Sequence, residues 1–245
     1  MPDLSVVIPV HDEEASLPRL WPELREVLGG LGLDAEVIFV DDGSRDRSAE
    51  IVRALRETDR RVRLVRLKAN AGETAATDAG VRAARGQWVV TMDADLQNDP
   101  RDIPALLAHL DRWDAVCGWR VNRRAGDSLV RRVSSSVANR VRNALSDETI
   151  HDSGCTFRAF RRECLRGLVL YRGFHRFVPT LLRLQGYRVV EVPVNHRPRR
   201  FGRSKYGVLN RVFAATVDLL VVRWMKSRRL RYEVAEDLGG DLMPE

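Results

Sequence analysis

The chain has 245 residues, of which 44% are hydrophobic and 31% are charged, so a packed globular core is expected and general disorder is excluded. Three cysteines, none of them in a Cys-x-x-Cys pair, argue against a disulfide scaffold or a zinc ribbon and favour a reducing compartment. The net charge of +7 is uneven: residues 1–118 carry 15 basic and 22 acidic side chains, and residues 119–245 carry 26 and 12. The second half therefore suits contact with anions such as phosphates, nucleic acid or a membrane surface.

Strand-like and helix-like segments alternate along the first half of the chain. Apolar, β-branched runs indicate strands, and amphipathic stretches indicate helices between them. In chain order, the predicted elements are strand 4–10, helix 14–28, strand 35–40, helix 48–57, strand 62–67, helix 74–84, strand 87–92 and helix 102–110. This alternation predicts right-handed crossovers, and thus an α/β fold with a Rossmann-like, mostly parallel sheet flanked by helices.

The second half changes character near Trp119, where basic residues become frequent. The predicted elements are helix 134–145, a loop at 152–155, helix 177–184, strand 187–194, a basic loop at 196–206 and helix 206–225. Charged residues interrupt the last helix, so its apolar run is too short to span a membrane. Its amphipathic pattern and the basic residues up to Arg231 are typical of attachment to an anionic leaflet, and the alternative is an ordinary helix packed on the core.

Carboxylates directly follow three of the predicted strands, in segments 11–14, 41–42 and 93–95. Because the carboxyl ends of parallel strands meet at one edge of a sheet, we expect these segments to face one crevice. Clustered carboxylates repel each other unless a hard cation or the hydroxyls of a sugar compensate. Neither a G-x-G-x-x-G after the first strand nor a G-x-x-x-x-G-K-[ST] anywhere is present, which argues against dinucleotide-binding and P-loop sites.

With these segments in order, the sequence resembles family 2 glycosyltransferases, specifically the polyprenyl-phosphate (dolichol-phosphate) sugar transferases. Each matching motif is a weak signal by itself, but the ordered set extends over nearly the whole chain and is specific. The matching positions are 7–13, 40–44, 70–72, 75–76, 93–97, 118–120, Arg131, Ser135, Asn139, 152–155, Arg158, 191–194, His196, Arg199, Gly202 and 204–206.

The resemblance implies a GT-A type catalytic domain over residues 1–205, an amphipathic basic helix near a membrane over 206–231, and a tail over 232–245. It further implies transfer of a hexose from GDP-mannose or a UDP-hexose to a polyprenyl phosphate, with a metal requirement and inversion at the anomeric carbon. The alternative is the same donor chemistry with a soluble or saccharide acceptor, for which Asp152 is the candidate general base. A nucleic-acid-binding role is disfavoured because no recognition motif is present.

By resemblance, the catalytic cation is Mg²⁺ or Mn²⁺, which stabilises the departing diphosphate. Asp95 and Gln97 would ligate this cation, and Asp93 would contact the nucleotide-sugar or the metal through water. Arg120 and Arg131 would hold the acceptor phosphate, because guanidinium groups bind phosphate oxygens bidentately. Ser135 joins the acceptor site, and the catalytic assignments are Asp93, Asp95, Arg120 and Arg131.

The resemblance also implies a donor-binding site. Its residues are Pro9, His11, Glu13, Val40, Asp41, Asp42, Asp93, Arg199, Ser204 and Lys205. His11 and the Asp after it stand where the family commonly has an aromatic residue and Asn. His196 is assigned a structural hydrogen bond in preference to a proton shuttle, and Cys155 is expected to be buried and without a catalytic role.

The N-terminal apolar run is too short for a signal peptide and lacks a basic region before it. Together with the resemblance, this predicts a cytoplasmic protein, peripheral to the inner face of a membrane, without a signal peptide or a transmembrane helix. We therefore expect its partners to be a nucleotide-sugar, a polyprenyl phosphate and an anionic membrane surface. Attachment would depend on the basic helix at 206–231 or on a separate membrane subunit.

Overall fold

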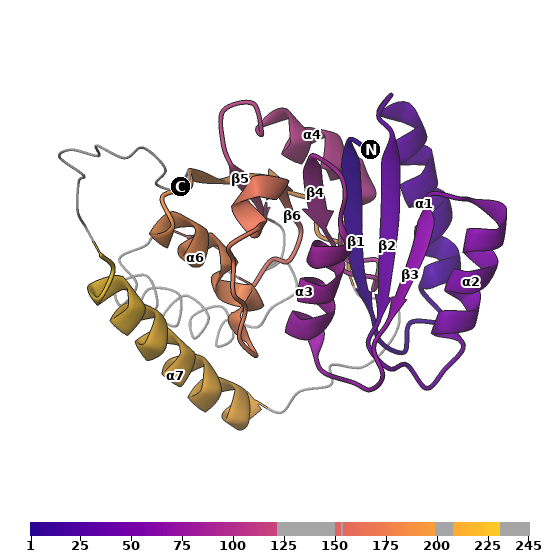
Figure 1. Ribbon diagram of the computed structural model, residues 1–245. Coiled ribbons are helices and arrows are strands. Elements are labelled where there is room, and N and C mark those ends of the chain that lie inside the picture. The colour runs from indigo at the N-terminus through magenta and orange to yellow at the C-terminus, as the bar shows by residue number, and fades with distance from the viewer. Residues whose placement is uncertain (122–149, 153, 199–207, 231–245) are drawn as a thin grey trace, which may run out of the picture.

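A computed structural model describes residues 1–121, 150–152, 154–198 and 208–230. Its centre is a seven-stranded sheet with the order β3-β2-β1-β4-β6-β5-β7 (Figure 1). The strands are β1 (Leu4–Val10), β2 (Ala35–Asp41), β3 (Val62–Arg66), β4 (Trp88–Thr91), β5 (Ala115–Arg120), β6 (Arg158–Arg161) and β7 (Val189–Val194). Strand β6 is antiparallel to both of its neighbours, β4 and β5, and all other neighbouring strands pair in parallel. The prediction of a mostly parallel α/β sheet is confirmed.

Helices cover both faces of the sheet (Figure 1). They are α1 (Leu17–Gly30), α2 (Ser48–Thr58), α3 (Glu73–Ala83), α4 (Ile103–Ala108), α6 (Val178–Leu184) and α7 (Val208–Ser227), with the 3₁₀ turns η1 (Pro100–Asp102), η3 (Arg162–Leu165) and η4 (Phe174–Phe177). One core packs α1, α2 and α4 against alternate strand residues such as Val6 and Ile8. The other core packs α3, α6 and α7 against the opposite face, where Val7 points. The period of two along β1 thus places a buried layer on each side of the sheet.

The predicted elements that fall on described residues are present, with shifted ends. The first helix begins at Leu17 and not at residue 14, because the chain before it makes hydrogen bonds to the loop after β2. Strands β5 and β6 were absent from the prediction. Strand β6 has only four residues, and an arginine stands at each end of it, so it offers no apolar alternation to recognise. The predicted helix at 134–145 lies outside the described residues.

Glu36 on β2 is a buried carboxylate, with 7% of its surface exposed. Its oxygens accept hydrogen bonds from Ser5 Oγ at 2.7 Å, from Arg63 Nη1 at 2.5 Å and from the backbone N–H of Arg85 at 2.8 Å. Burial by itself raises the pKa of Glu36, but these hydrogen bonds and the charge of Arg63 outweigh burial and lower the pKa. The charged form therefore stabilises the fold.

We expect Glu36→Gln to lower the free energy of unfolding at pH 7 by about 1 to 3 kcal/mol, because the charge-assisted bonds are lost. Since the folded-state pKa lies below the ordinary value of 4.5, the stabilisation is present above that pH and is lost as the pH falls through the folded pKa. Urea unfolding at several pH values between 7 and 3 should show the difference between wild type and variant shrinking with acid. A constant difference would contradict this account.

Candidate functional site

The carboxyl end of β1 continues into residues that contact the end of β2. His11 Nδ1 lies 3.0 Å from the backbone oxygen of Asp42, and Asn70 Nδ2 lies 3.2 Å from His11 Nε2. The backbone N–H of Glu13 donates to Ser48 Oγ at 2.8 Å. The fold therefore brings the predicted donor-binding residues His11, Glu13 and Asp42 to one edge of the sheet.

Asp41 and Asp42 are buried, and their carboxylates hold loops in place. Asp41 accepts hydrogen bonds from Arg66 Nε and from the backbone N–H of Ser44, both at 2.9 Å. Asp42 accepts from the backbone N–H groups of residues 71–72, at 2.7 and 2.9 Å. The sequence analysis placed both residues in the donor-binding site, and the structure shows that all four of their carboxylate oxygens have protein partners. These bonds fix the loops at this edge of the sheet.

Asp93 and Asp95 lie in a tight turn just after β4. The backbone N–H of Asp93 donates to Asn98 Oδ1 at 2.9 Å, and the backbone N–H of Gln97 donates to Asp95 Oδ1 at 3.1 Å. Leu96, which follows Asp95, has a φ of 65°, in the left-handed region that residues other than glycine rarely adopt. Such strained backbone is concentrated at functional sites. The turn keeps the two carboxylates close together.

The electrostatics of this turn favour a bound cation. Burial raises the pKa of Asp93, and the negative charge of Asp95 raises it further. The hydrogen bond from Thr156 and the charges of Arg120 and Arg158 act in the opposite direction but do not outweigh these effects. A cation beside the two carboxylates would remove their mutual repulsion.

The donor set fits Mg²⁺ or Mn²⁺, because Asp93, Asp95 and Gln97 offer carboxylate and amide oxygens. Among the residues that the structure describes, no group of three or more His, Cys, Asp or Glu side chains is placed to hold a metal by itself. Mg²⁺ is commonly held by one or two carboxylates together with the phosphates of a substrate. The turn suits that mode of binding.

The segment after β7 is anchored beside this turn. Arg197 Nη1 donates to Glu23 at 2.6 Å, its Nη2 lies 2.7 Å from Asp99, and its backbone N–H donates to the backbone oxygen of Gln97 at 2.9 Å. His196 Nε2 lies 3.4 Å from the side-chain nitrogen of Gln97. The structural hydrogen bond assigned to His196 from the sequence stays a prediction.

Arg120, at the end of β5, is paired with Asp152. Its Nε and Nη2 donate to the two carboxylate oxygens at 2.6 and 2.9 Å. Asp152 is held in turn by Glu191 on β7, which accepts from the backbone N–H groups of His151 and Asp152. Because both oxygens of Asp152 bind Arg120, the structure argues against the general-base role considered for this residue. The pair lies close enough to the turn for Arg120 to act electrostatically on Asp93.

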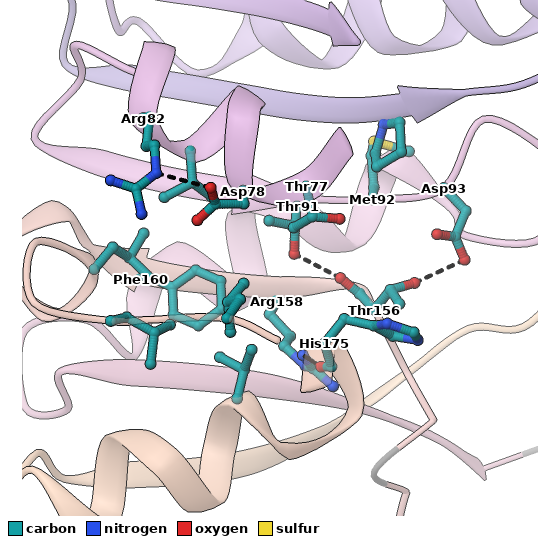
Figure 2. Close-up of a pocket in the computed structure, with 16 residues that line it drawn as sticks. Thr77, Asp78, Arg82, Thr91, Met92, Asp93, Thr156, Arg158, Phe160 and His175 are labelled. Carbon is teal, nitrogen blue, oxygen red and sulfur yellow. Dashed lines mark hydrogen bonds and ion pairs between the residues drawn. The ribbon is translucent and has the colours of Figure 1, made fainter. Parts of the chain in front are cut away.

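A narrow cavity of about 40 Å³ adjoins the site (Figure 2). It lies between α3, β4, β6 and the chain around η4, and Asp93 and Thr156 line it. Thr156 donates to Asp93 and was not identified from the sequence, where its only signal is its position just after the motif at 152–155. Pro9 also lines this cavity, and Val40 is buried in the core.

Five of the predicted site residues, Arg131, Ser135, Arg199, Ser204 and Lys205, lie outside the described residues. The domain boundary at 205–206 and the tail at 232–245 lie there as well. Cys155 is buried as expected, and burial raises the pKa of its thiol to about 11. A thiol of this kind stays protonated at neutral pH and is a poor nucleophile.

Relatives with known roles share much of this sequence. A dodecaprenyl-phosphate galacturonate synthase from Rhizobium johnstonii is 36% identical over 236 residues, which are 94% of this chain and 69% of the relative. An undecaprenyl-phosphate 4-deoxy-4-formamido-L-arabinose transferase from Salmonella paratyphi B is 38% identical over 208 residues, 84% of this chain. The match covers only 63% of the length of the Salmonella protein, so this chain spans less than two thirds of it.

Solved structures share the fold. A glucosyl-3-phosphoglycerate synthase from Mycobacterium tuberculosis superposes with a TM-score of 0.66 at 21% identity, over 92% of this chain and 80% of the other. A mannosyltransferase from Pyrobaculum calidifontis, in complex with GDP-mannose and Mn²⁺, has a TM-score of 0.60 at 22% identity, over 94% and 65% of the two chains. The model of glycosyl transferase family 2 matches residues 5–168, more than half of the chain. The turn with Asp93 and Asp95 lies within that match, and the chain belongs to glycosyl transferase family 2.

Proposed function

We propose that this protein transfers a hexose from a nucleotide-diphosphate sugar to the phosphate of a polyprenyl lipid, with inversion at the anomeric carbon. The observation that carries the proposal is the paired carboxylate turn of Asp93 and Asp95, which lies close to the partly buried cation Arg120. The names of both curated relatives include a polyprenyl phosphate, which supports this class of acceptor.

Asp93, Asp95 and Gln97 would hold Mg²⁺ or Mn²⁺, which supplies charge stabilisation to the departing nucleoside diphosphate. Arg120 donates two hydrogen bonds to Asp152, and its Nη1 has no hydrogen bond to any residue that the structure describes. In this proposal that nitrogen would bind an acceptor phosphate while Asp152 keeps the guanidinium fixed.

A phosphate oxygen of the acceptor would then attack C1 of the sugar, forming the new C1–O bond as the bond from C1 to the diphosphate breaks. The acceptor is an anion at neutral pH and has no proton to lose, so this reaction needs no general base. The pairing of Asp152 with Arg120 is compatible with such a reaction, because it leaves no unpaired carboxylate at this position.

The test incubates the purified protein with Mg²⁺ or Mn²⁺, vesicles that contain polyprenyl phosphate, and a panel of radiolabelled UDP- and GDP-sugars. Label that moves into organic solvent with one donor, and does not when EDTA is present, would support the proposal and identify the sugar. Donor hydrolysis, or transfer to a soluble acceptor without labelling of the lipid, would count against the polyprenyl acceptor.

We also propose that α7 contacts an anionic membrane surface. Among the described residues, no helix is long and apolar enough to cross a membrane. Leu219 and Val222 of α7 are buried, and Asp218 forms an ion pair with Arg176 at 3.3 Å, so one face of the helix packs on the domain. The other face exposes apolar side chains, among them Trp224 at 62%. Apolar residues next to a basic helix end suit the interface of an anionic bilayer.

Reversing two of the exposed charges at the end of α7, by Arg228→Glu with Arg229→Glu, should weaken binding to vesicles that contain anionic lipid. Each basic residue near such a surface contributes about 1 kcal/mol, so we expect a loss of roughly 30-fold or more in sedimentation assays. The matched control is Arg53→Glu, on α2, with Arg60→Glu, just after α2; this helix lies at the opposite end of the molecule from α7 (Figure 1). Equal binding by both double variants would contradict the proposal.

A further inference from the structure

Two threonines connect β4 and β6 to Asp93, and neither belongs to the predicted site. Thr91 Oγ1, at the end of β4, donates to the backbone oxygen of Thr156 at 2.6 Å. Thr156 Oγ1 donates to Asp93 Oδ2 at 2.7 Å. Figure 2 shows both bonds in a row, directed toward the carboxylate.

The antiparallel pairing of β4 with β6 creates this arrangement. Thr91 is opposite Arg158 in the register, so residues just after β4 lie beside residues just before β6. Thr156 therefore approaches Asp93 from the neighbouring strand, although 63 positions separate the two residues in sequence. Only a short β6 inserted between β4 and β5 brings these side chains together.

We propose that Thr156 is a positioning residue that orients the Asp93 carboxylate toward the bound cation and donor diphosphate. The terminal torsion of an aspartate is soft, so the carboxylate rotates easily unless a partner holds it. Repulsion from Asp95 favours rotation away from the turn. The Thr156 hydroxyl holds Oδ2, and in this proposal Oδ1 is the oxygen directed at the ligand.

The bond from Thr91 gives this arrangement its rigidity. It holds the backbone carbonyl of Thr156, so the backbone that carries the hydroxyl is anchored to the end of β4. The backbone N–H of Asp93 is held separately by Asn98. Side chain and backbone of Asp93 are therefore fixed by two independent partners. Preorganisation of this kind lowers the cost of ordering the site when the ligand binds.

The inference rests on the proposed function only in its assumption that Asp93 faces a metal-bound nucleotide.

The test compares Thr156→Val, which keeps the shape of the side chain but removes the hydroxyl, with Thr156→Ser, which keeps the hydroxyl. The matched control is Thr77→Val: Thr77 lines the same cavity, but its hydroxyl bonds to the backbone oxygen of Glu73 in its own helix. The readout is the affinity for Mn²⁺ in the presence of UDP or GDP, measured by electron paramagnetic resonance.

We expect Thr156→Val to weaken Mn²⁺ binding roughly 10-fold or more, because the Asp93 carboxylate loses the hydrogen bond that orients it. Thr156→Ser and Thr77→Val should bind as the wild type does, and all three variants should remain folded at the temperature of the binding assay. Unchanged Mn²⁺ affinity in Thr156→Val would overturn the proposal, as would equal losses in Thr156→Val and Thr77→Val. If Thr156→Val does not fold, Thr156→Ala removes the hydroxyl without adding a buried methyl group.

This readout needs neither a lipid nor sugar transfer. If the wild type binds Mn²⁺ with a nucleotide but labels no lipid, the polyprenyl acceptor is refuted while the Thr156 comparison still decides the positioning role. If the wild type binds no Mn²⁺ with either nucleotide, both proposals fail.

Discussion

Asp95→Ala is expected to reduce sugar transfer by about 100- to 1,000-fold while leaving the protein folded. Asp95 is 8% exposed and lies in the turn after β4, where its carboxylate adjoins Asp93. A cation held there stabilises charge on the leaving group by several kcal/mol, and each 1.4 kcal/mol corresponds to about a tenfold change in rate. Initial rates measured by transfer of label into organic solvent, with metal in excess, give the comparison.

The control for this experiment is Glu57→Gln, which removes an exposed carboxylate on α2, far from the turn. It should transfer sugar at the wild-type rate. Asp95→Asn should fall close to Asp95→Ala, because a neutral amide keeps the shape but loses the charge that attracts the cation. Wild-type activity in Asp95→Ala, or full activity of the wild type after metal chelation, would exclude this role for the turn.

Asp152→Ala should lower the free energy of unfolding by about 3 kcal/mol or more, the loss typical of breaking a buried ion pair from one side. The side chains of Arg120 and Asp152 are 13% and 7% exposed, and two short hydrogen bonds join them. Removing the carboxylate leaves the guanidinium buried without its partner. For a protein of this size the melting temperature should fall by roughly 6 to 12 °C. Urea unfolding and calorimetry measure both quantities.

The matched control for this pair is Asp78→Ala, which removes one partner of the exposed pair between Asp78 and Arg82 on α3. Its unfolding midpoint should stay close to that of the wild type, since exposed pairs are screened by solvent. The double variant Arg120→Met with Asp152→Leu should be more stable than Asp152→Ala, because it leaves no unpaired charge. If Asp152→Ala unfolds at the same denaturant concentration as the wild type, the pair does not stabilise the fold.

The sequence was sufficient to predict the alternating half of the fold. Segments 4–10, 35–40 and 62–67 are apolar runs separated by amphipathic stretches. The spacing of apolar residues follows the local geometry of a strand or a helix, so it can be recognised from neighbouring residues alone. The acidic segments after strands 4–10, 35–40 and 87–92 were also informative, because parallel strands present their carboxyl ends at one edge of the sheet. Strand β6 escaped prediction, since four residues with an arginine at each end show no period.

The hydrogen-bond and ion-pair partners of the site residues depended on tertiary contacts. From the sequence, Asp41 was a candidate donor-binding residue and Asp152 a candidate general base, and only the structure shows that Arg66 and Arg120 bind their carboxylates. Thr156 reaches Asp93 only because β6 is inserted antiparallel beside β4. Residue type and spacing thus determined which chemical groups lie at this edge of the sheet. Contacts between residues 25 to 63 positions apart decide which of these groups already have a protein partner. No local sequence pattern encodes such contacts.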